Sequence, residues 1–399
     1  MNNFYVGYNS DWGSFFRDIC CACDPSELMK IVDAVIQVHP FSDKGMIDPE
    51  DILAGYRPIF LYGAGRFAQS VIENWEKINR KPDFCVDSNP VTWGKSIKGI
   101  FILSPEALFE CKEPPLVVVT AMINSSIQEQ LADYGIPCLF AERNGKVGYL
   151  PGHHLRDKFD SFKRVWGMLA DEYSRQTFLA VAKARIFQCF NFEMLGSPFL
   201  NHVAVGSQYF PKDIFGFSPN EMWVDCGAYD GDFLVSGYML MHQLGYPPVR
   251  AHAFEADSLN TERLCRTIAI YHLKDVIIHH ILVGAKDGWC ENPDFNNCRQ
   301  EKDRNTFSVQ TSRLDTVLAG SEVNYIKMDI EGAELNALEG AFITIEKWRP
   351  KLAICMYHET AHLLDIPLFI NSNFQDYKIY IRHHSSNSLW ETVCYAVPN

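Results

Sequence analysis

Short apolar runs recur through the C-terminal half of the chain, and several of them run directly into an acid or a histidine. Runs of this kind are typical of strands that are buried on both faces of a parallel sheet. The predicted strands are Met222–Val224, Ala251–Phe254, Tyr325–Met328, Lys351–Tyr357, Tyr377–Ile381 and Thr392–Val397. The segments between them leave room for helices, so the pattern predicts an α/β domain with a mostly parallel sheet.

One predicted helix follows the strand that ends at Met328. Glu331 and Glu334 would open this helix, which we expect to run to about Lys347. Carboxylates in a first turn are stabilised by the partial charge of the helix N-terminus, which is one interpretation of both glutamates, a part in the site being the other. Asp329 is different, because it stands at the carboxyl end of a parallel strand, where such sheets place their chemistry.

The first predicted strand runs into a turn that contains two glycines, Asp225-Cys-Gly227-Ala-Tyr-Asp-Gly231. Glycine allows a positive φ and a close approach of the backbone, so such a turn can wrap under a small cofactor. The ligand then lies beyond the carboxyl end of the strand. The candidate cofactor-binding residues here are Asp225, Gly227, Ala228, Tyr229 and Gly231.

A second acid follows at the distance expected of a nucleoside site. Glu255 ends the next strand 24 residues after Gly231, with Ala256 beside it. A carboxylate at this place can accept bonds from two ribose hydroxyls, in dinucleotide enzymes and methyltransferases alike. The turn lacks the Gly-x-Gly-x-x-Gly pattern that suits a pyrophosphate, and Asp225 would repel one. The same carboxylate suits a cationic amine such as that of S-adenosylmethionine, so charge favours the methyl donor.

Five segments occur in the order seen in one methyltransferase family. They are Trp223–Gly231, Ala253–Asp257, Ser312–Thr316, Ile326–Glu334 and Tyr357–His358. The chain between residues 220 and 397 therefore resembles the FkbM-type methyltransferases, with Lys-Met-Asp-Ile-Glu-Gly-Ala-Glu as the most diagnostic motif. Asp257 departs from the family pattern, which has proline there.

The resemblance implies a class I methyltransferase fold with S-adenosyl-L-methionine as the cofactor. Members of this family commonly methylate hydroxyls of sugars, glycolipids or macrolides. The expected acceptor is therefore a hydroxyl of a sugar, glycolipid or polysaccharide precursor. Glu255, the expected partner of the ribose, is intact.

The expected catalytic residues stand at the tips of two neighbouring strands. Methyl transfer to oxygen requires that the hydroxyl be positioned and its proton removed. His358 is the expected base, because imidazole titrates near neutral pH, and Asp329 is the expected positioning group, with Glu331 next. The alternative is that His358 only ends its strand, hydrogen-bonded to a neighbouring loop. Asp329 and Glu331 offer oxygen ligands for a divalent cation, but no further residue completes a set, so no metal is expected.

Three pairs of adjacent histidines also invite comparison with metal sites: His153-His154, His279-His280 and His383-His384. Adjacent residues on a strand point to opposite faces, so neither strand pair can readily chelate one ion. We interpret these residues as structural or solvated histidines.

The N-terminal part of the chain carries a second alternating pattern. Its predicted strands are Arg57–Tyr62, Phe84–Asp87 and Leu116–Thr120. A turn with Gly63 and Gly65 leads into a helix, and Asp87 follows 22 residues after Gly65, so this part is Rossmann-like. It is interpreted either as a nucleotide or nucleotide-sugar site at Gly63, Gly65 and Asp87, or as a degenerate module for docking or homo-oligomer formation.

Helical periodicity separates the two α/β parts. Apolar residues from Val165 to Tyr173 and from Phe178 to Ile186 recur at helical spacing, with a break expected at Asp171. We expect a Rossmann-like domain over residues 1–150, a helical connector over 151–215 and a class I methyltransferase domain over 216–399. The connector is expected to pack against the methyltransferase sheet and to help wall its site. A polar loop is expected over 292–305.

Composition narrows the class of protein. The chain of 399 residues exceeds what one core usually serves, and its net charge of −13 argues against a broad nucleic-acid surface. No apolar run is long enough to span a bilayer, and no secretory signal is visible. The 13 cysteines are scattered, which is typical of reduced thiols in a cytoplasmic protein. The expected partner is a small-molecule or glycan acceptor.

The sequence leaves three functions open. The first is an O-methyltransferase that acts on a glycan or glycolipid hydroxyl. The second is an NAD- or nucleotide-sugar-binding oxidoreductase or epimerase that uses the Gly63 turn, although no Tyr-x-x-x-Lys pair follows that turn. The third is a catalytically silent assembly or nucleotide-sugar-sensing protein, which the methyltransferase motifs argue against.

Overall fold

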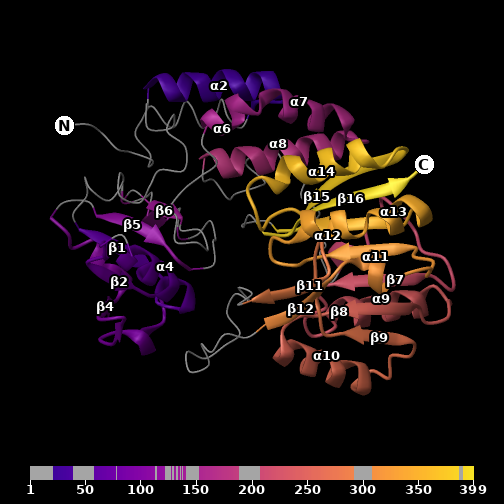
Figure 1. Ribbon diagram of the computed structural model, residues 1–399. Coiled ribbons are helices and arrows are strands. Elements are labelled where there is room, and N and C mark those ends of the chain that lie inside the picture. Colours follow the sequence, from indigo (N-terminus) through magenta and orange to yellow (C-terminus); the bar gives the residue numbers. More distant parts are fainter. Residues whose placement is uncertain are drawn as a thin grey trace. The chain divides into compact units, whose positions relative to one another are not determined.

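A computed structural model describes residues 21–38, 58–77, 79–112, 115–121, 152–187, 207–291, 308–385 and 390–399, with some positions between 127 and 140. The contacts divide the chain into two compact units. Unit 1 comprises residues 1–163, 176–199 and 385–389, and unit 2 comprises 164–175, 200–384 and 390–399. In Figure 1 the sheet of unit 1 is indigo to magenta, and that of unit 2 runs from rose to yellow.

Unit 1 is built on a six-stranded sheet with the order β3-β4-β2-β1-β5-β6. Its strands are β1 (Ile59–Tyr62), β2 (Phe84–Val86), β3 (Ser96–Ile97), β4 (Ile100–Leu103), β5 (Leu116–Val119) and β6 (Cys138–Phe140). All neighbouring strands pair in parallel except β3 and β4. The strand order reverses at β1, as it does in a doubly wound sheet, and the predicted N-terminal strands are present.

Helix α4 (Arg66–Lys77) follows β1 through the predicted glycine turn. Its buried residues recur at helical spacing and pack in one cluster with β1, β2 and β5; they are Ala68, Val71, Ile72 and Trp75. Further helices are α2 (Pro25–Val38), α6 (Gly152–Asp157), α7 (Phe159–Met168) and α8 (Glu172–Phe187). Arg57, predicted to begin the first strand, lies outside the described residues.

Unit 2 is built on a seven-stranded sheet with the order β15-β16-β14-β13-β7-β8-β9. Its strands are β7 (Met222–Cys226), β8 (Arg250–Phe254), β9 (Val276–His279), β13 (Tyr325–Met328), β14 (Lys351–Cys355), β15 (Tyr377–His383) and β16 (Thr392–Pro398). The strands from β9 to β14 are parallel, whereas β16 is antiparallel to both of its neighbours. This confirms the predicted class I methyltransferase sheet, and it brings the carboxyl ends of β7, β8, β13 and β14 to one side.

The remaining elements of unit 2 are helices and a small second sheet. The helices are α9 (Asp232–Gln243), α10 (Ser258–Ile270), α11 (Leu314–Val317), α12 (Glu334–Gly340), α13 (Phe342–Trp348) and α14 (His362–Asn373). The small sheet has the order β10-β12-β11 and consists of β10 (Leu282–Val283), β11 (Gly288–Glu291) and β12 (Ser308–Ser312).

The single helix predicted from Glu331 to Lys347 is wrong. Glu331 and Gly332 have φ values of 59° and 104°, which are left-handed and cannot begin a right-handed helix. The helix therefore starts at Glu334 and is interrupted at Ala341, whose φ is −105°.

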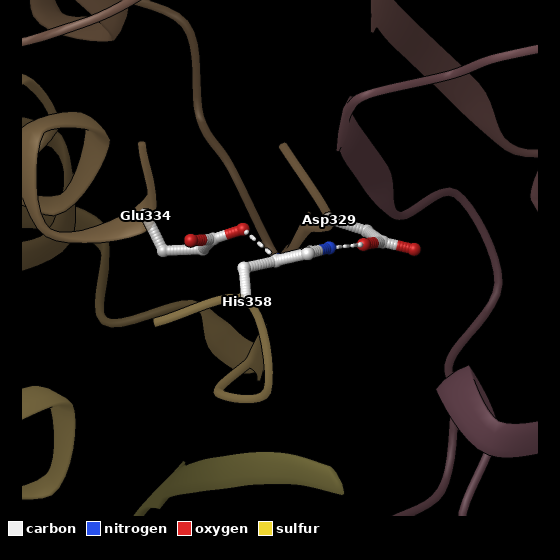
Figure 2. A group of neighbouring side chains, drawn as sticks. All are labelled: Asp329, Glu334 and His358. Atoms are coloured by element: carbon white, nitrogen blue, oxygen red, sulfur yellow. Dashed lines mark hydrogen bonds and ion pairs between the residues drawn. The ribbon is translucent and has the colours of Figure 1, made fainter. Parts of the chain in front are cut away.

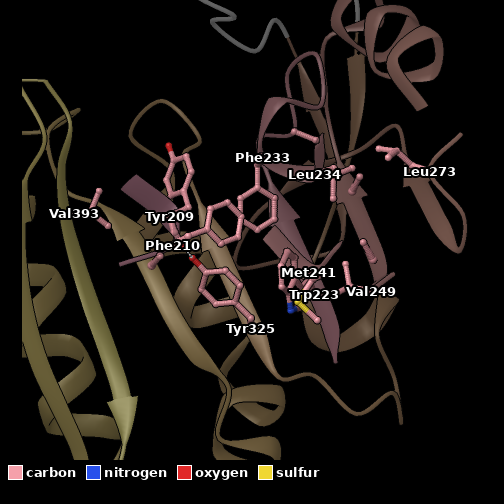
Figure 3. Packing of buried hydrophobic residues seen from close by; sticks show 14 of the residues in the cluster. Tyr209, Phe210, Trp223, Phe233, Leu234, Met241, Val249, Leu273, Tyr325 and Val393 are labelled. Carbon is pink, nitrogen blue, oxygen red and sulfur yellow. Dashed lines mark hydrogen bonds between the residues drawn. The ribbon is translucent and has the colours of Figure 1, made fainter. Parts of the chain in front are cut away.

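Aromatic rings fill the core of unit 2 beside β7 and β13. Trp223, Phe233 and Tyr325 are fully buried, and Phe210 stacks on Phe233 with ring centroids 5.2 Å apart. Figure 3 shows these rings gathered together with Tyr209. Large aromatic side chains bury much apolar area and pack in specific geometries. The cluster therefore stabilises β7 and β13 and holds Tyr209 near their ends.

The predicted connector forms α6, α7 and α8, with the expected break at residues 169–171. Leu169 forms a parallel bridge with Ile379 in β15, and Ser174 Oγ accepts the Ile381 N–H at 3.0 Å. The segment around the break therefore packs on the edge of the sheet of unit 2. The three predicted segment boundaries stay a prediction, and the loop at 292–305 lies outside the described residues. No described helix combines the length and apolarity needed to cross a membrane.

Candidate active site

The glycine turn after β7 lies against the end of β13. Gly227 has a φ of +81°, and a β-carbon there would lie 1.9 Å from the carbonyl oxygen of Asp329. The N–H groups of Gly227 and Ala228 both donate to the carbonyl oxygen of Phe254 at 2.9 Å. Because of the positive φ and the close approach, glycine is required at residue 227.

The turn then passes through further left-handed residues into α9. Tyr229 has a φ of +47°, and it is 49% exposed. Gly231 has a φ of +91° at the N-cap of α9. A non-glycine residue in this conformation is uncommon, and such residues cluster at functional sites.

Glu255 closes the turn from the end of β8. Its Oε2 accepts the Tyr229 N–H at 2.8 Å, and its Oε1 accepts the Asp257 N–H at 2.8 Å. Burial raises the pKa of Glu255, while these hydrogen bonds oppose the shift. Each carboxylate oxygen has two acceptor positions, so Glu255 keeps capacity for a ribose hydroxyl. The carbonyl oxygen of the next residue, Ala256, accepts a hydrogen bond from His280 Nε2 at 3.1 Å.

Asp225 is fully buried below the turn and is paired with a lysine. Its Oδ1 accepts a hydrogen bond from Lys327 Nζ at 2.9 Å, and Lys327 also donates to the carbonyl oxygen of Gly227 at 2.7 Å. Burial raises the pKa of Asp225 to about 6, although Lys327 opposes the shift. The charge that was expected to repel a pyrophosphate is therefore compensated, which weakens that argument for the methyl donor. Lys327 was not among the predicted site residues, although a lysine within an apolar strand is itself a signal of a buried partner.

Asp329, at the end of β13, accepts hydrogen bonds from two tyrosines. Tyr209 donates to Oδ2 at 2.8 Å and Tyr357 donates to Oδ1 at 3.0 Å. Burial, and then neighbouring ionisable groups, raise the pKa of both tyrosines well above the ordinary value, so both hydroxyls stay protonated. The carboxylate is thus held in one orientation while its side chain remains 26% exposed. Neither tyrosine was predicted as a site residue.

His358 lies between two carboxylates just after β14, as Figure 2 shows. Its Nδ1 is hydrogen-bonded to Glu334 Oε1 at 2.8 Å. Its Nε2 lies 3.3 Å from Asp329 Oδ1 and 3.7 Å from Glu331 Oε2. The structure thus brings the three predicted catalytic residues together, and Glu334 fixes the imidazole so that Nε2 faces Asp329.

Glu334 is fully buried in the first turn of α12. Besides His358 it accepts the Ile330 N–H at 2.9 Å, and its Oε2 lies 3.3 Å from His362 Nδ1. Burial opposes ionisation, but contacts with the two histidines, His358 first, lower the pKa of Glu334 to about 2. An ionised acceptor at Nδ1 holds a proton on that nitrogen of His358. The interpretation of Glu334 as only a first-turn acid was therefore incomplete.

A further carboxyl group, Glu391, stands just before β16 with a strained φ of +71°. Gln208 Nε2 donates to its Oε2 at 2.6 Å. Burial, and then the charge of Asp329, raise the pKa of Glu391. Beside it, Trp390 is 39% exposed, and its ring centroid lies 6.0 Å from that of Tyr357. Neither Glu391 nor Trp390 was predicted, because only the return of β16 to the sheet brings them here.

The adjacent histidines make structural contacts where their side chains are described. His279 is hydrogen-bonded to His252 on the neighbouring strand at 2.8 Å. His383 and His384 bond to hydroxyl groups of β16 at 2.8 and 2.7 Å. The side chains of His153-His154 lie outside the described part of the chain.

The predicted second nucleotide site lies in unit 1, at the turn after β1. Gly63 has a φ of +107°, whereas no atom lies within 4 Å of a β-carbon placed on Gly65. Asp87 Oδ2 accepts the Ala64 N–H at 2.7 Å, so Asp87 closes this turn as Glu255 closes the turn of unit 2. The structure brings the three predicted residues to one turn, and the binding of a nucleotide there stays a prediction.

Residues 225–384 match the family model described as the methyltransferase FkbM domain. The chain therefore carries a methyltransferase FkbM domain. The domain begins at Asp225 in β7 and includes Glu255, Asp329 and His358. The resemblance inferred from the sequence motifs is confirmed.

The chain is also similar in fold to a crystal structure of methyltransferase FkbM from Methylobacillus flagellatus KT. The two share 23% sequence identity with a TM-score of 0.70, and the similarity covers 94% of this chain and 100% of that chain. An rRNA methylase from Streptococcus thermophilus matches with a TM-score of 0.32 and 9% identity, over 48% of this chain and 92% of that chain. Fibrillarin from Aeropyrum pernix, in complex with S-adenosyl-L-methionine, matches with a TM-score of 0.30 and 10% identity, over 48% of this chain and 73% of that chain.

No curated protein matches the chain in sequence. The FkbM domain contains all of the predicted cofactor-binding residues of unit 2 and all of the predicted catalytic residues. Tyr209 precedes the matched segment and Glu391 follows it, so both flanks of the FkbM domain contribute side chains to the site.

Proposed function

We propose that the FkbM domain transfers a methyl group from S-adenosyl-L-methionine to a hydroxyl of a sugar, glycolipid or polysaccharide precursor. The observation that carries this proposal is the arrangement on one side of the sheet of unit 2. The glycine turn and Glu255 stand at the ends of β7 and β8, and Asp329 and His358 stand at the ends of β13 and β14. A nucleoside held by the first pair of strands has its reactive group directed toward the second.

Two features of the turn support this cofactor. Glu255 keeps acceptor capacity for the ribose hydroxyls, with Ala228, Tyr229 and Ala256 beside it. Gly227 and Gly231 have positive φ values, so the backbone of the turn can approach a small cofactor closely. When bound, S-adenosyl-L-methionine supplies a methyl group that passes from sulfur to the acceptor oxygen, as the S–C bond breaks and an O–C bond forms.

Asp329 and His358 act on the acceptor hydroxyl in this proposal. Tyr209 and Tyr357 hold the Asp329 carboxylate, so it accepts the hydrogen bond of the hydroxyl and fixes its direction. His358 Nε2 receives the proton, because Glu334 already engages Nδ1. General-base catalysis of this kind contributes about 10²–10⁴-fold to the rate.

The oxidoreductase or epimerase alternative depends on the Gly63 turn of unit 1. Asp87 there accepts two backbone N–H groups, as Glu255 does in unit 2, so the acid of each turn does not separate the two functions. The histidine and the carboxylates that the structure brings together lie in unit 2, which favours methyl transfer as the activity.

Isothermal titration with S-adenosylhomocysteine tests the proposal. The full chain should bind it, and Glu255→Ala should weaken binding by about tenfold or more, because the ribose loses an acceptor. Glu262→Ala changes an exposed glutamate of α10 and serves as the matched control, with unchanged affinity expected. Binding of NAD or a nucleotide sugar instead, at a site insensitive to Glu255→Ala, would favour the alternative.

A further inference from the structure

The ligand atoms at the ends of β13 and β14 have a spacing typical of a metal site. His358 Nε2 lies 3.3 Å from Asp329 Oδ1 and 3.7 Å from Glu331 Oε2. Two neighbouring ligands, each about 2.1 Å from one cation, lie about 3.0 to 3.4 Å apart. The first distance falls in this range. The second is longer, and the Glu331 side chain that makes it is 52% exposed.

The state of His358 Nε2 is a separate observation that points to a ligand. The imidazole is 4% exposed, and its Nε2 faces Asp329 Oδ1 at 3.3 Å. Its contact with Asp329 Oδ1 is longer than the usual N–H···O distance. A buried nitrogen directed at two carboxylates is satisfied when a cation stands between them.

We propose that a divalent transition-metal cation binds His358 Nε2, Asp329 Oδ1 and Glu331 Oε2. Imidazole suits zinc and carboxylates suit manganese, so Mn²⁺ and Zn²⁺ are the cations that match this set. No metal was expected from the sequence, because Asp329 and Glu331 lacked a third ligand there. The fold supplies it by bringing the end of β14 beside the end of β13.

Hydrogen bonds from neighbouring side chains hold the proposed ligands, as is usual for metal ligands in proteins. A metal-binding histidine usually donates its other ring N–H to a carboxylate, and Glu334 takes that place at His358 Nδ1. Ligating carboxylates are hydrogen-bonded in turn, as Asp329 is by Tyr209 and Tyr357. Ligand atoms of Glu334, Asp329 and His358 lie within 4.8 Å of one another. We assign Glu334 as the residue that positions His358 and not as a ligand, because it is hydrogen-bonded to Nδ1, the ring nitrogen that faces away from Asp329.

This inference rests on the proposed function and adds to its account of how the acceptor hydroxyl loses its proton. A divalent cation lowers the proton affinity of a hydroxyl that it binds. The bound cation would make the acceptor hydroxyl easier for water to deprotonate, and His358 would then serve as a ligand. Without the cation, His358 Nε2 is the base.

Cation binding to the full chain tests the proposal independently of activity. The protein is dialysed against EDTA and titrated with Mn²⁺, with electron paramagnetic resonance reporting free Mn²⁺, and separately with Zn²⁺ in a calorimeter. We expect one cation per chain for at least one of the two metals. Binding should be lost in His358→Gln and in Asp329→Asn, and it should weaken by about 10- to 100-fold in Glu334→Gln.

His242→Gln is the matched control, because this histidine is exposed on α9, and it should bind as the wild type does. Glu331→Gln changes a half-exposed side chain, and its affinity should fall even if His358→Gln does not fold. Failure of the wild type to bind either cation would overturn the proposal, as would unchanged binding in Glu331→Gln. S-adenosylhomocysteine is titrated with and without EDTA in parallel. If the chain binds it but binds neither cation, the cation site is wrong and the proposed function stands. If the chain does not bind it either, the proposed function fails as well.

Discussion

The carbonyl oxygen of Asp329 occupies the space that a side chain at Gly227 would need. A β-carbon at residue 227 would lie 1.9 Å from this oxygen. The turn proposed to hold the cofactor and the strand end proposed to hold the acceptor therefore touch through their backbones.

Gly227→Ala should destabilise unit 2, because the added methyl group meets a main-chain oxygen and a φ of +81° strains any residue with a β-carbon. We expect the free energy of unfolding to fall by about 1–3 kcal/mol. Gly216→Ala is the control, since no atom lies within 4 Å of its β-carbon position. If urea unfolding gives equal stabilities for the two variants, the close approach does not constrain the turn.

Lys327→Met should also destabilise the fold, because it leaves the buried Asp225 carboxylate without its partner. Removal of one member of a buried ion pair costs about 3–5 kcal/mol. The double variant with Asp225→Asn removes both charges and should recover part of the loss. Urea unfolding of the wild type, both single variants and the double variant measures this coupling. Strictly additive losses would mean that the two groups do not compensate each other.

The sequence was sufficient to predict that Gly227, Glu255 and Asp329 stand at the ends of parallel strands, because each follows directly from a strand and its turn. The contacts of Asp329 could not be predicted in this way. Tyr209 reaches its carboxylate from 120 positions away, and Tyr357 does so from the neighbouring strand. Such contacts depend on the order of strands in the sheet, which local patterns do not contain.

The pairing of charged side chains in the site could not be predicted from the sequence either. Asp225 was interpreted as a single negative charge, whereas Lys327 on the adjacent strand β13 compensates it. Glu334 looked like an acid placed for the helix N-terminus, yet burial and His358 make it the group that orients the imidazole. In both cases the missing information was which side chain lies opposite on a neighbouring element.

The pair of His252 and His279 should make stability depend on pH. Burial lowers the pKa of both histidines, that of His279 to about 4, whereas an unfolded chain titrates its histidines near about 6.5. The unfolded state binds protons first, so stability is full above about pH 6.5 and falls as the pH drops toward the folded pKa. Melting temperatures at pH 7 and pH 5 should differ less in His279→Gln than in the wild type. An equal difference in His279→Gln and in the control His242→Gln would contradict this.

His358→Ala should slow methyl transfer by about 10²–10⁴-fold at saturating cofactor. The affinity for S-adenosylhomocysteine should stay close to that of the wild type, because the cofactor contacts lie at β7 and β8. Tyr357→Phe removes one hydrogen bond to Asp329 and should slow the reaction less. The assay follows label from the methyl group of S-adenosylmethionine into an acceptor that the wild type methylates. A His358→Ala turnover near that of the wild type would remove this residue from the mechanism.

A crystal structure of the full chain with S-adenosylhomocysteine tests the central claim most directly. We predict that the ribose lies at Glu255, below the turn from Gly227 to Gly231, and that the sulfur faces Asp329 and His358. The account would be contradicted if the ligand were bound at the Gly63 turn of unit 1, or if its sulfur were directed away from Asp329.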